Sequence, residues 1–308
     1  MLPALLATIL WSYCLLPARR SVAQMGGNAA NFWRLLAAVI AMGALAAAGG
    51  TRLGGGAFGW FFLSGIIGFG FGDIGVWFAL PRLGTRLTLL MAQCLAVPFA
   101  GITEWLWLGT TIPTGQLIAL LVILPGIALA LFPEHEREHA EQRKYIAGVL
   151  FGTLAGIGQG VGAVFSRKAF FLVETSDTAS AGDYIFLGAS SGFVRLIGGL
   201  LIAGGFWFIS RYHTAWRTPP EEGHRRGARA SKIKNVLLCA AAGPIFGVIC
   251  YQWALATTPS VIVQVIVSMS PLVILPLAWY HEGDRPSVRS LIGTVVAVAG
   301  VVLLAVIG

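Results

Sequence analysis

The chain consists of long apolar stretches separated by short polar connectors. A helix needs about 20 mostly apolar residues to cross the hydrocarbon core of a bilayer. Ten stretches of the 308-residue chain meet or approach that length, namely residues 2–18, 27–48, 57–80, 86–108, 114–132, 145–172, 184–210, 234–256, 260–280 and 288–307. The pattern predicts an all-α integral membrane protein of ten transmembrane helices, with too few residues left over for a separate soluble domain.

The second half of the pattern repeats the first. After a shift of 175 positions, Gly68, Phe71, Gly72, Ala79 and Leu80 return as Gly243, Phe246, Gly247, Ala254 and Leu255. Shifts of 161 and 174 positions align the second predicted helix with the seventh and the fifth with the tenth. We therefore predict two five-helix repeats, residues 1–140 and 141–308. Because five is an odd number, the second repeat enters the membrane inverted, as in many secondary transporters.

Composition supports the membrane assignment and argues against a nucleic-acid partner. Hydrophobic residues make up 56% of the chain and charged residues 11%, with a mean hydropathy of +0.79. Soluble domains carry roughly 25% charged residues. The net charge of +8 comes mostly from basic residues at the ends of predicted helices, where lipid headgroups account for them. The expected partners are the lipid bilayer and a small-molecule substrate; a monomer and a homodimer fit the sequence equally.

Basic residues are distributed unequally between the two sides of the predicted membrane. The connectors after odd-numbered helices contain sixteen Arg and Lys residues, whereas the opposite connectors contain three. Cytoplasmic connectors are usually the basic ones. We therefore expect a multi-pass protein of a bacterial inner or plasma membrane, with the odd-numbered connectors in the cytoplasm and both termini outside. Residues 2–18 could imitate a signal peptide, but Arg19 and Arg20 follow them directly and favour a first span.

Several recurring residues resemble the drug/metabolite transporter superfamily, in particular its EamA-like members of ten helices. The resemblance rests on an Arg early in the second helix of each repeat, an Ala-Leu pair ending the third, and a Ser-Pro in the ninth, here Arg34, Arg195, Ala79-Leu80, Ala254-Leu255 and Ser270-Pro271. It implies a transporter of small organic solutes. It also implies that the third, fourth, eighth and ninth helices surround the substrate. In the first repeat, Pro98 lacks the preceding Ser and an acid stands at Glu104.

Four charged residues lie inside predicted spans: Arg34, Asp73, Glu104 and Arg195. Each costs about 2.5 to 3.5 kcal/mol at a helix centre, so we expect them to have partners. One interpretation is structural, with the arginines pairing with the acids or capping helix ends. The other makes Asp73 or Glu104 a carboxylate that couples transport to protons or contacts a cation.

Aromatic and polar side chains gather on the predicted cavity helices and on the first helix of each repeat. Small-molecule sites combine apolar walls with a few polar groups. The candidate substrate-cavity residues are Asp73, Trp77, Gln93, Tyr251, Gln252, Gln264, Ser268, Tyr13 and Gln159. The alternative is that Trp and Tyr near helix ends form an interfacial belt. Pro98 and Pro271 interrupt opposed helices and are the hinge candidates.

Two motifs that suggest enzymes fit this chain poorly. Gly70-x-Gly72-x-x-Gly75 matches a dinucleotide-binding pattern but lies inside a span with no preceding strand, which favours close helix packing. His135 and His139 form an HExxH pattern in a short charged connector with no cleft. We therefore expect no catalytic residues, no bound metal and no cofactor.

The function that these features favour is secondary-active transport of a small organic metabolite or drug-like solute by alternating access. Since no nucleotide-binding motif is present, a proton or other solute gradient would supply the driving force. The alternatives are a lipid-handling flippase and a membrane-embedded enzyme on the same scaffold. The sequence leaves open the substrate and the direction of transport.

The predicted orientation has a direct test. A reporter enzyme that works only outside the cytoplasm should be active when fused after Gly308, because ten spans bring the C-terminus to the outer side. A fusion within residues 211–234 should be inactive in the same assay. The opposite pattern would show that the basic connectors face outward.

Overall fold

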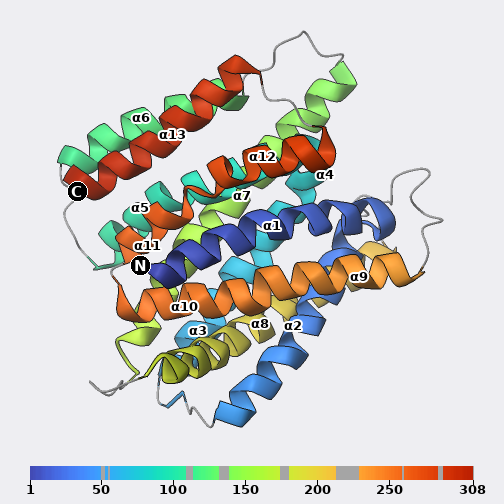
Figure 1. Cartoon of the computed structure of the whole chain (residues 1–308), viewed down its shortest axis with the longest axis vertical. Coiled ribbons are helices and arrows are strands. Elements are labelled where there is room, and N and C mark those ends of the chain that lie inside the picture. The colour runs from blue at the N-terminus through green and yellow to red at the C-terminus, as the bar shows by residue number, and fades with distance from the viewer. Residues whose placement is uncertain are drawn as a thin grey trace.

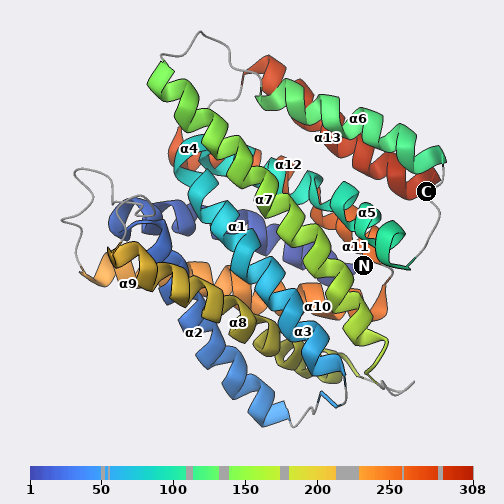
Figure 2. The same cartoon turned by 180° about the vertical axis from the view of Figure 1, so that it is seen from behind.

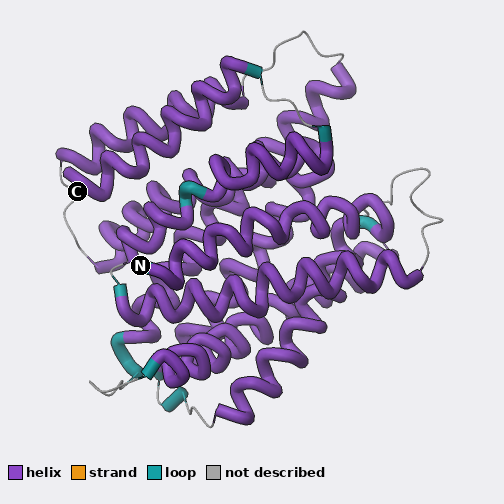
Figure 3. Tube along the Cα trace, viewed as in Figure 1, coloured by secondary structure: helices purple, strands orange, loops and turns teal. Residues whose placement is uncertain are grey.

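Helices account for nearly all of the chain that the computed structural model describes, which is residues 1–49, 53–54, 56–108, 114–131, 139–173, 180–212, 229–258, 260–283 and 287–307. Within these ranges the helices are joined by short turns, and no strand is present (Figure 3). Most of the connector from 211 to 234 and of the HExxH pattern lies outside the described residues.

The elements follow one another along the chain as α-helices, with two π-helices, η1 and η3. In order they are α1 (Leu2–Met25), α2 (Gly27–Gly49), α3 (Ala57–Gly65), η1 (Ile66–Gly72), α4 (Asp73–Cys94), α5 (Ala96–Leu108), α6 (Thr114–Leu131), α7 (His139–Phe170), α8 (Ala181–Tyr212), α9 (Arg229–Ala240), η3 (Ala241–Gly247), α10 (Val248–Thr257), α11 (Ser260–Val267), α12 (Ser270–Glu282) and α13 (Val288–Ile307).

These elements confirm a helical membrane protein with many apolar spans. Seven described helical stretches are long and apolar enough to cross a membrane, and residues 121–130 and 288–303 form shorter apolar helices. One of the seven, Ala57–Trp107, is 51 residues long, which exceeds the bilayer thickness more than twofold at 1.5 Å per residue. It bends at Gly84, whose φ of 78° and ψ of 175° are not helical. The stretch therefore supplies two spans.

The irregularities of the two halves fall at matching positions. The π-helix η1 covers residues 66–72 and η3 covers residues 241–247, so the two are 175 positions apart, as in the sequence repeat. A second break separates α4 from α5 at Leu95 and α11 from α12 at Ser268 and Met269. π-Helices are rare and occur often at functional sites. Because the two π-helices are separated by the same shift as the sequence repeat, the two halves share the same backbone arrangement at this point.

The two halves pack against each other along their whole length. The most extensive helix pairs each join one half to the other: α6 with α13, α4 with α7, and α2 with α8. Figures 1 and 2 show α6 and α13 lying side by side at one edge of the bundle, away from α2 and α8.

Glycines let the helices of the two halves approach closely. A Cβ atom on Gly75 would stand 2.5 Å from the carbonyl oxygen of Phe151 on α7, and one on Gly126 would stand 2.5 Å from the backbone nitrogen of Ala297 on α13. Small residues at such interfaces bring helix backbones together in membranes. The glycines of the Gly70-to-Gly75 pattern thus serve helix packing, which agrees with the interpretation from the sequence.

Candidate functional site

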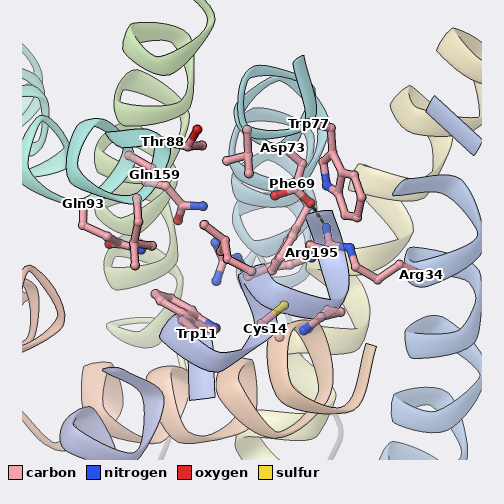
Figure 4. Close-up of a pocket in the computed structure, with 17 residues that line it drawn as sticks. Trp11, Cys14, Arg34, Phe69, Asp73, Trp77, Thr88, Gln93, Gln159 and Arg195 are labelled. Carbon is pink, nitrogen blue, oxygen red and sulfur yellow. Dashed lines mark hydrogen bonds and ion pairs between the residues drawn. The ribbon is translucent and has the colours of Figure 1, made fainter. Parts of the chain in front are cut away.

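A cavity of about 70 Å³ lies between the two halves. Its walls come from α1, α2, η1, α4, α7, α8 and η3 (Figure 4). The lining residues that carry polar or aromatic groups are Trp11, Cys14, Arg34, Phe69, Asp73, Trp77, Thr88, Gln93, Gln159 and Arg195.

Arg34 and Asp73 form an ion pair on the wall of the cavity (Figure 4). Arg34 is 6% exposed and Asp73 5%. The same Nη2 of Arg34 also donates a hydrogen bond of 3.0 Å to Oδ1 of Asn31, and the guanidinium lies 5.1 Å from the ring centre of Trp77. These contacts neutralise two charges that would otherwise be costly in this environment. They support the structural interpretation of Arg34.

Arg195 occupies the corresponding place in the second half but bonds to a neutral partner. Its Nη1 donates a hydrogen bond of 3.0 Å to Oε1 of Gln252, and its guanidinium lies 5.0 Å from the ring centre of Phe69. The side chain is buried, with 3% exposure. Among the described residues Arg195 makes no ion pair.

The two arginines are related by the repeat. Arg34 lies over Trp77, and Arg195 donates a hydrogen bond to Gln252. Gln252 is the residue 175 positions after Trp77, so the two arginines contact repeat-related residues. Each arginine also reaches the π-helix of the opposite half. A Cβ atom on Gly68 would lie 3.2 Å from Nη2 of Arg195, and one on Gly243 would lie 3.5 Å from Nη1 of Arg34. The first contact is tight and the second is an ordinary van der Waals contact, so both guanidinium groups lie directly against a glycine of the opposite half.

The structure brings four of the predicted cavity residues together and places the others behind or outside the wall. Asp73, Trp77, Gln93 and Gln159 line the cavity. Tyr13 does not, and its side chain is 40% exposed on the outer side of α1.

The remaining four predicted residues, on α10 and in the α11–α12 segment, are buried but do not line the cavity. Nε2 of Gln264 donates a 2.9 Å hydrogen bond to the hydroxyl of Tyr251, whose ring lies 4.8 Å from that of Trp11. The hydroxyl of Ser268 donates a 2.7 Å hydrogen bond to the carbonyl of Val265, one turn earlier. Together with Gln252, which holds Arg195, these residues form a second layer that supports the wall.

Glu104 and the two prolines lie away from the cavity. Glu104 is partly exposed on α5 and is not a lining residue. Pro98 follows the break at Leu95 by three residues, and Pro271 is the second residue of α12, directly after the break at Ser268 and Met269. No group of three or more potential metal ligands occurs in the described part of the chain.

Several cavity residues were not predicted from the sequence. Trp11, Cys14, Leu15 and Ala18 of α1 line the cavity at positions i, i+3, i+4 and i+7. This spacing marks one face of a helix, so a helical-face analysis of the first span would have found them. Cys14 also lies beside α9, since its Sγ is 3.2 Å from that of Cys239.

The fold and the cavity together define a multi-pass helical membrane protein with a polar site between two repeated halves. The chain matches the EamA-like transporter family over residues 1–132 and 146–306, and it belongs to this family. It is also similar to a solved crystal structure, with a TM-score of 0.62 over 99% of this chain and 96% of the other. At 14% identity that similarity concerns the fold alone. No curated protein shows significant sequence similarity.

The ion pair on the cavity wall gives a stability prediction. Asp73→Asn leaves Arg34 buried without its counter-charge, which should lower the free energy of unfolding by about 3 to 5 kcal/mol. Arg34→Gln should cost a similar amount, whereas the double variant should recover part of the loss because both charges are gone. Melting temperatures of the detergent-purified variants measure these effects.

Asp183→Asn is the control for this experiment, because Asp183 is an exposed carboxylate at the start of α8 that bonds only to nearby Ser180. It should cost about 1 kcal/mol or less, as for a helix cap. Losses at Arg34 and Asp73 that simply add in the double variant would show that the two side chains do not stabilise each other.

Proposed function

We propose that this protein is a secondary-active transporter that moves a small organic solute across the membrane by alternating access. The observation that carries the proposal is a cavity with charged and amide side chains in its wall, placed between the two repeated halves of an EamA-like chain. Midplane sites between repeats are the common plan of such transporters, since rocking of one half against the other opens the site to either side.

The matched irregularities supply the moving parts of this mechanism. The breaks before Pro98 and Pro271 divide the two corresponding spans, and η1 and η3 interrupt the preceding spans at the same register. Proline removes a backbone hydrogen bond and allows a helix to bend. We assign Pro98 and Pro271 to hinges of two opposed gates, with the five-helix repeats inverted relative to each other.

Gradient coupling is assigned to Asp73. It lines the cavity and pairs with Arg34, so protonation of its carboxylate would break the pair and free the guanidinium. Glu104 does not line the cavity, so we assign it no coupling role. The basic connectors face the cytoplasm in this proposal, as their Arg and Lys content favours.

Cys14 provides a test of alternating access that needs no knowledge of the substrate. With Cys94, Cys239 and Cys250 replaced by Ser, Cys14 is the single thiol and lines the cavity. A membrane-impermeant thiol reagent should label it from either face, in right-side-out and in inverted vesicles, because each open state exposes the cavity to one side.

A variant that keeps only Cys94 is the matched control, since this thiol is also buried but packs in an apolar cluster with Leu90 and Val97. It should stay unlabelled from both faces. Labelling of Cys14 from one face only would show a one-sided pocket and contradict alternating access.

The coupling role of Asp73 has a separate test. A thermal-shift screen of purified protein against a metabolite panel identifies a solute, and proteoliposomes then report its uptake under a pH gradient. Asp73→Asn should lower gradient-driven accumulation by at least about tenfold, equivalent to 1.4 kcal/mol, while retaining exchange of the solute without a gradient. Glu104→Gln should leave both activities unchanged. Gradient-driven accumulation by Asp73→Asn at the normal rate would exclude the proton-relay role.

A further inference from the structure

We propose that the solute carried by this protein is an organic anion and that Arg195 holds its negative group. The inference rests on the proposed function, because it concerns the occupant of the transport cavity. Three observations carry it: the net charge of the cavity wall, the break in symmetry between the two halves, and unpartnered polar atoms around Arg195.

The cavity wall has one positive charge in excess. Its charged residues are two arginines and a single acid, Asp73. Asp73 forms its ion pair with Arg34, so one acid serves two guanidinium groups and Arg195 has no ion-pair partner of its own among the described residues. Inside a membrane protein, an isolated buried charge is strongly disfavoured unless another charge or a polar group pairs with it. A bound anion would supply the missing charge.

The repeat identifies the residue of the second half that corresponds to Asp73, and that residue is not an acid. Asp73 is the first residue of α4, directly after η1. The residue 175 positions later is Val248, the first residue of α10, directly after η3. Val248 is buried in an apolar cluster. The second half therefore has the arginine and the π-helix but no carboxylate at the position that Asp73 occupies in the first.

Hydrogen-bonding capacity around Arg195 also remains unused. A guanidinium has five N–H donors in a planar fork that fits two oxygens of a carboxylate or another oxyanion. Within the described chain, its one hydrogen bond goes to Gln252. Nε of Arg195 is buried without a partner, as is Nε of Arg34 on the opposite half. Arg195 differs in having no acid beside it in an ion pair, so its free donor capacity suits an anionic acceptor, while Gln252 holds it from behind the wall.

The rest of the wall indicates the kind of molecule that carries the charge. The indoles of Trp11 and Trp77 offer apolar surfaces, and the amides of Gln93 and Gln159 can bond to neutral polar groups (Figure 4). The volume of about 70 Å³ limits the occupant of this state to a small molecule. We therefore assign a small organic monoanion with an apolar or aromatic body, such as a monocarboxylate.

Matched pairs of probes test this assignment at equilibrium. Each pair consists of a carboxylate and its primary amide, which differ little in shape: acetate and acetamide, lactate and lactamide, benzoate and benzamide, and indole-3-acetate and its amide. Binding to the detergent-purified protein is measured by thermal shift and calorimetry. At least one carboxylate should bind about tenfold or more tightly than its amide, as expected for a hydrogen bond to a charged partner.

Variants of Arg195 connect this preference to the residue. Arg195→Gln should abolish the preference for carboxylate, and Arg195→Lys should retain part of it because the charge remains. Without ligand, Arg195→Gln should melt at the same temperature as the wild type or higher, since it removes an unpaired buried charge. A purely structural role for Arg195 would instead lower the melting temperature. Arg34→Gln is the comparison, because it leaves Asp73 unpaired and should melt lower.

The outcomes separate this inference from the proposed function. If no carboxylate in the set binds more tightly than its amide, or if Arg195→Gln keeps the preference, the anion assignment is wrong. Two-sided labelling of Cys14 would then still support alternating access with a different solute. Carboxylate preference together with one-sided labelling would support the anion site and exclude transport by this route.

Discussion

The hydrocarbon core of a bilayer contains no water, and this constraint governs where the protein can keep polar side chains. Every charge in that region needs a partner within the protein. Arg34, Asp73 and Arg195 all lie on the wall of one cavity between the two halves. The outer faces of the bundle present apolar side chains, such as Phe71 and Phe246. Three of the buried charged side chains are therefore gathered on this one wall.

Duplication gives the two halves the same backbone but not the same chemistry. The π-helices and the helix breaks recur at fixed shifts, and each arginine reaches toward a glycine in the π-helix of the opposite half. Only the first half pairs its arginine with an acid, because Val248 stands where the repeat would place one. A cavity built from identical halves would carry balanced charges. The presence of an acid in one half only gives this cavity its positive character.

Close packing and flexibility are divided between different parts of the same helices. Gly75 and Gly126 bring backbones of the two halves into direct contact, so these regions have little freedom to move apart. The breaks near Pro98 and Pro271 leave short segments that end inside the bundle. The breaks occur at matching positions in the two halves, away from the close contacts of Gly75 and Gly126.

The sequence by itself determined the apolar helical pattern and the repeat, and it singled out Arg34, Asp73 and Arg195 as buried charges, because hydrophobicity and spacing are local properties of the chain. It also predicted Trp77, Gln93 and Gln159 as lining residues. The tertiary structure alone decided that Arg34 pairs with Asp73 while Arg195 does not pair, and that Trp11 rather than Tyr13 faces the cavity. Residues two apart differ by about 200° around a helix. Which of them faces inward depends on how the helix is rotated against its neighbours, and packing fixes that rotation.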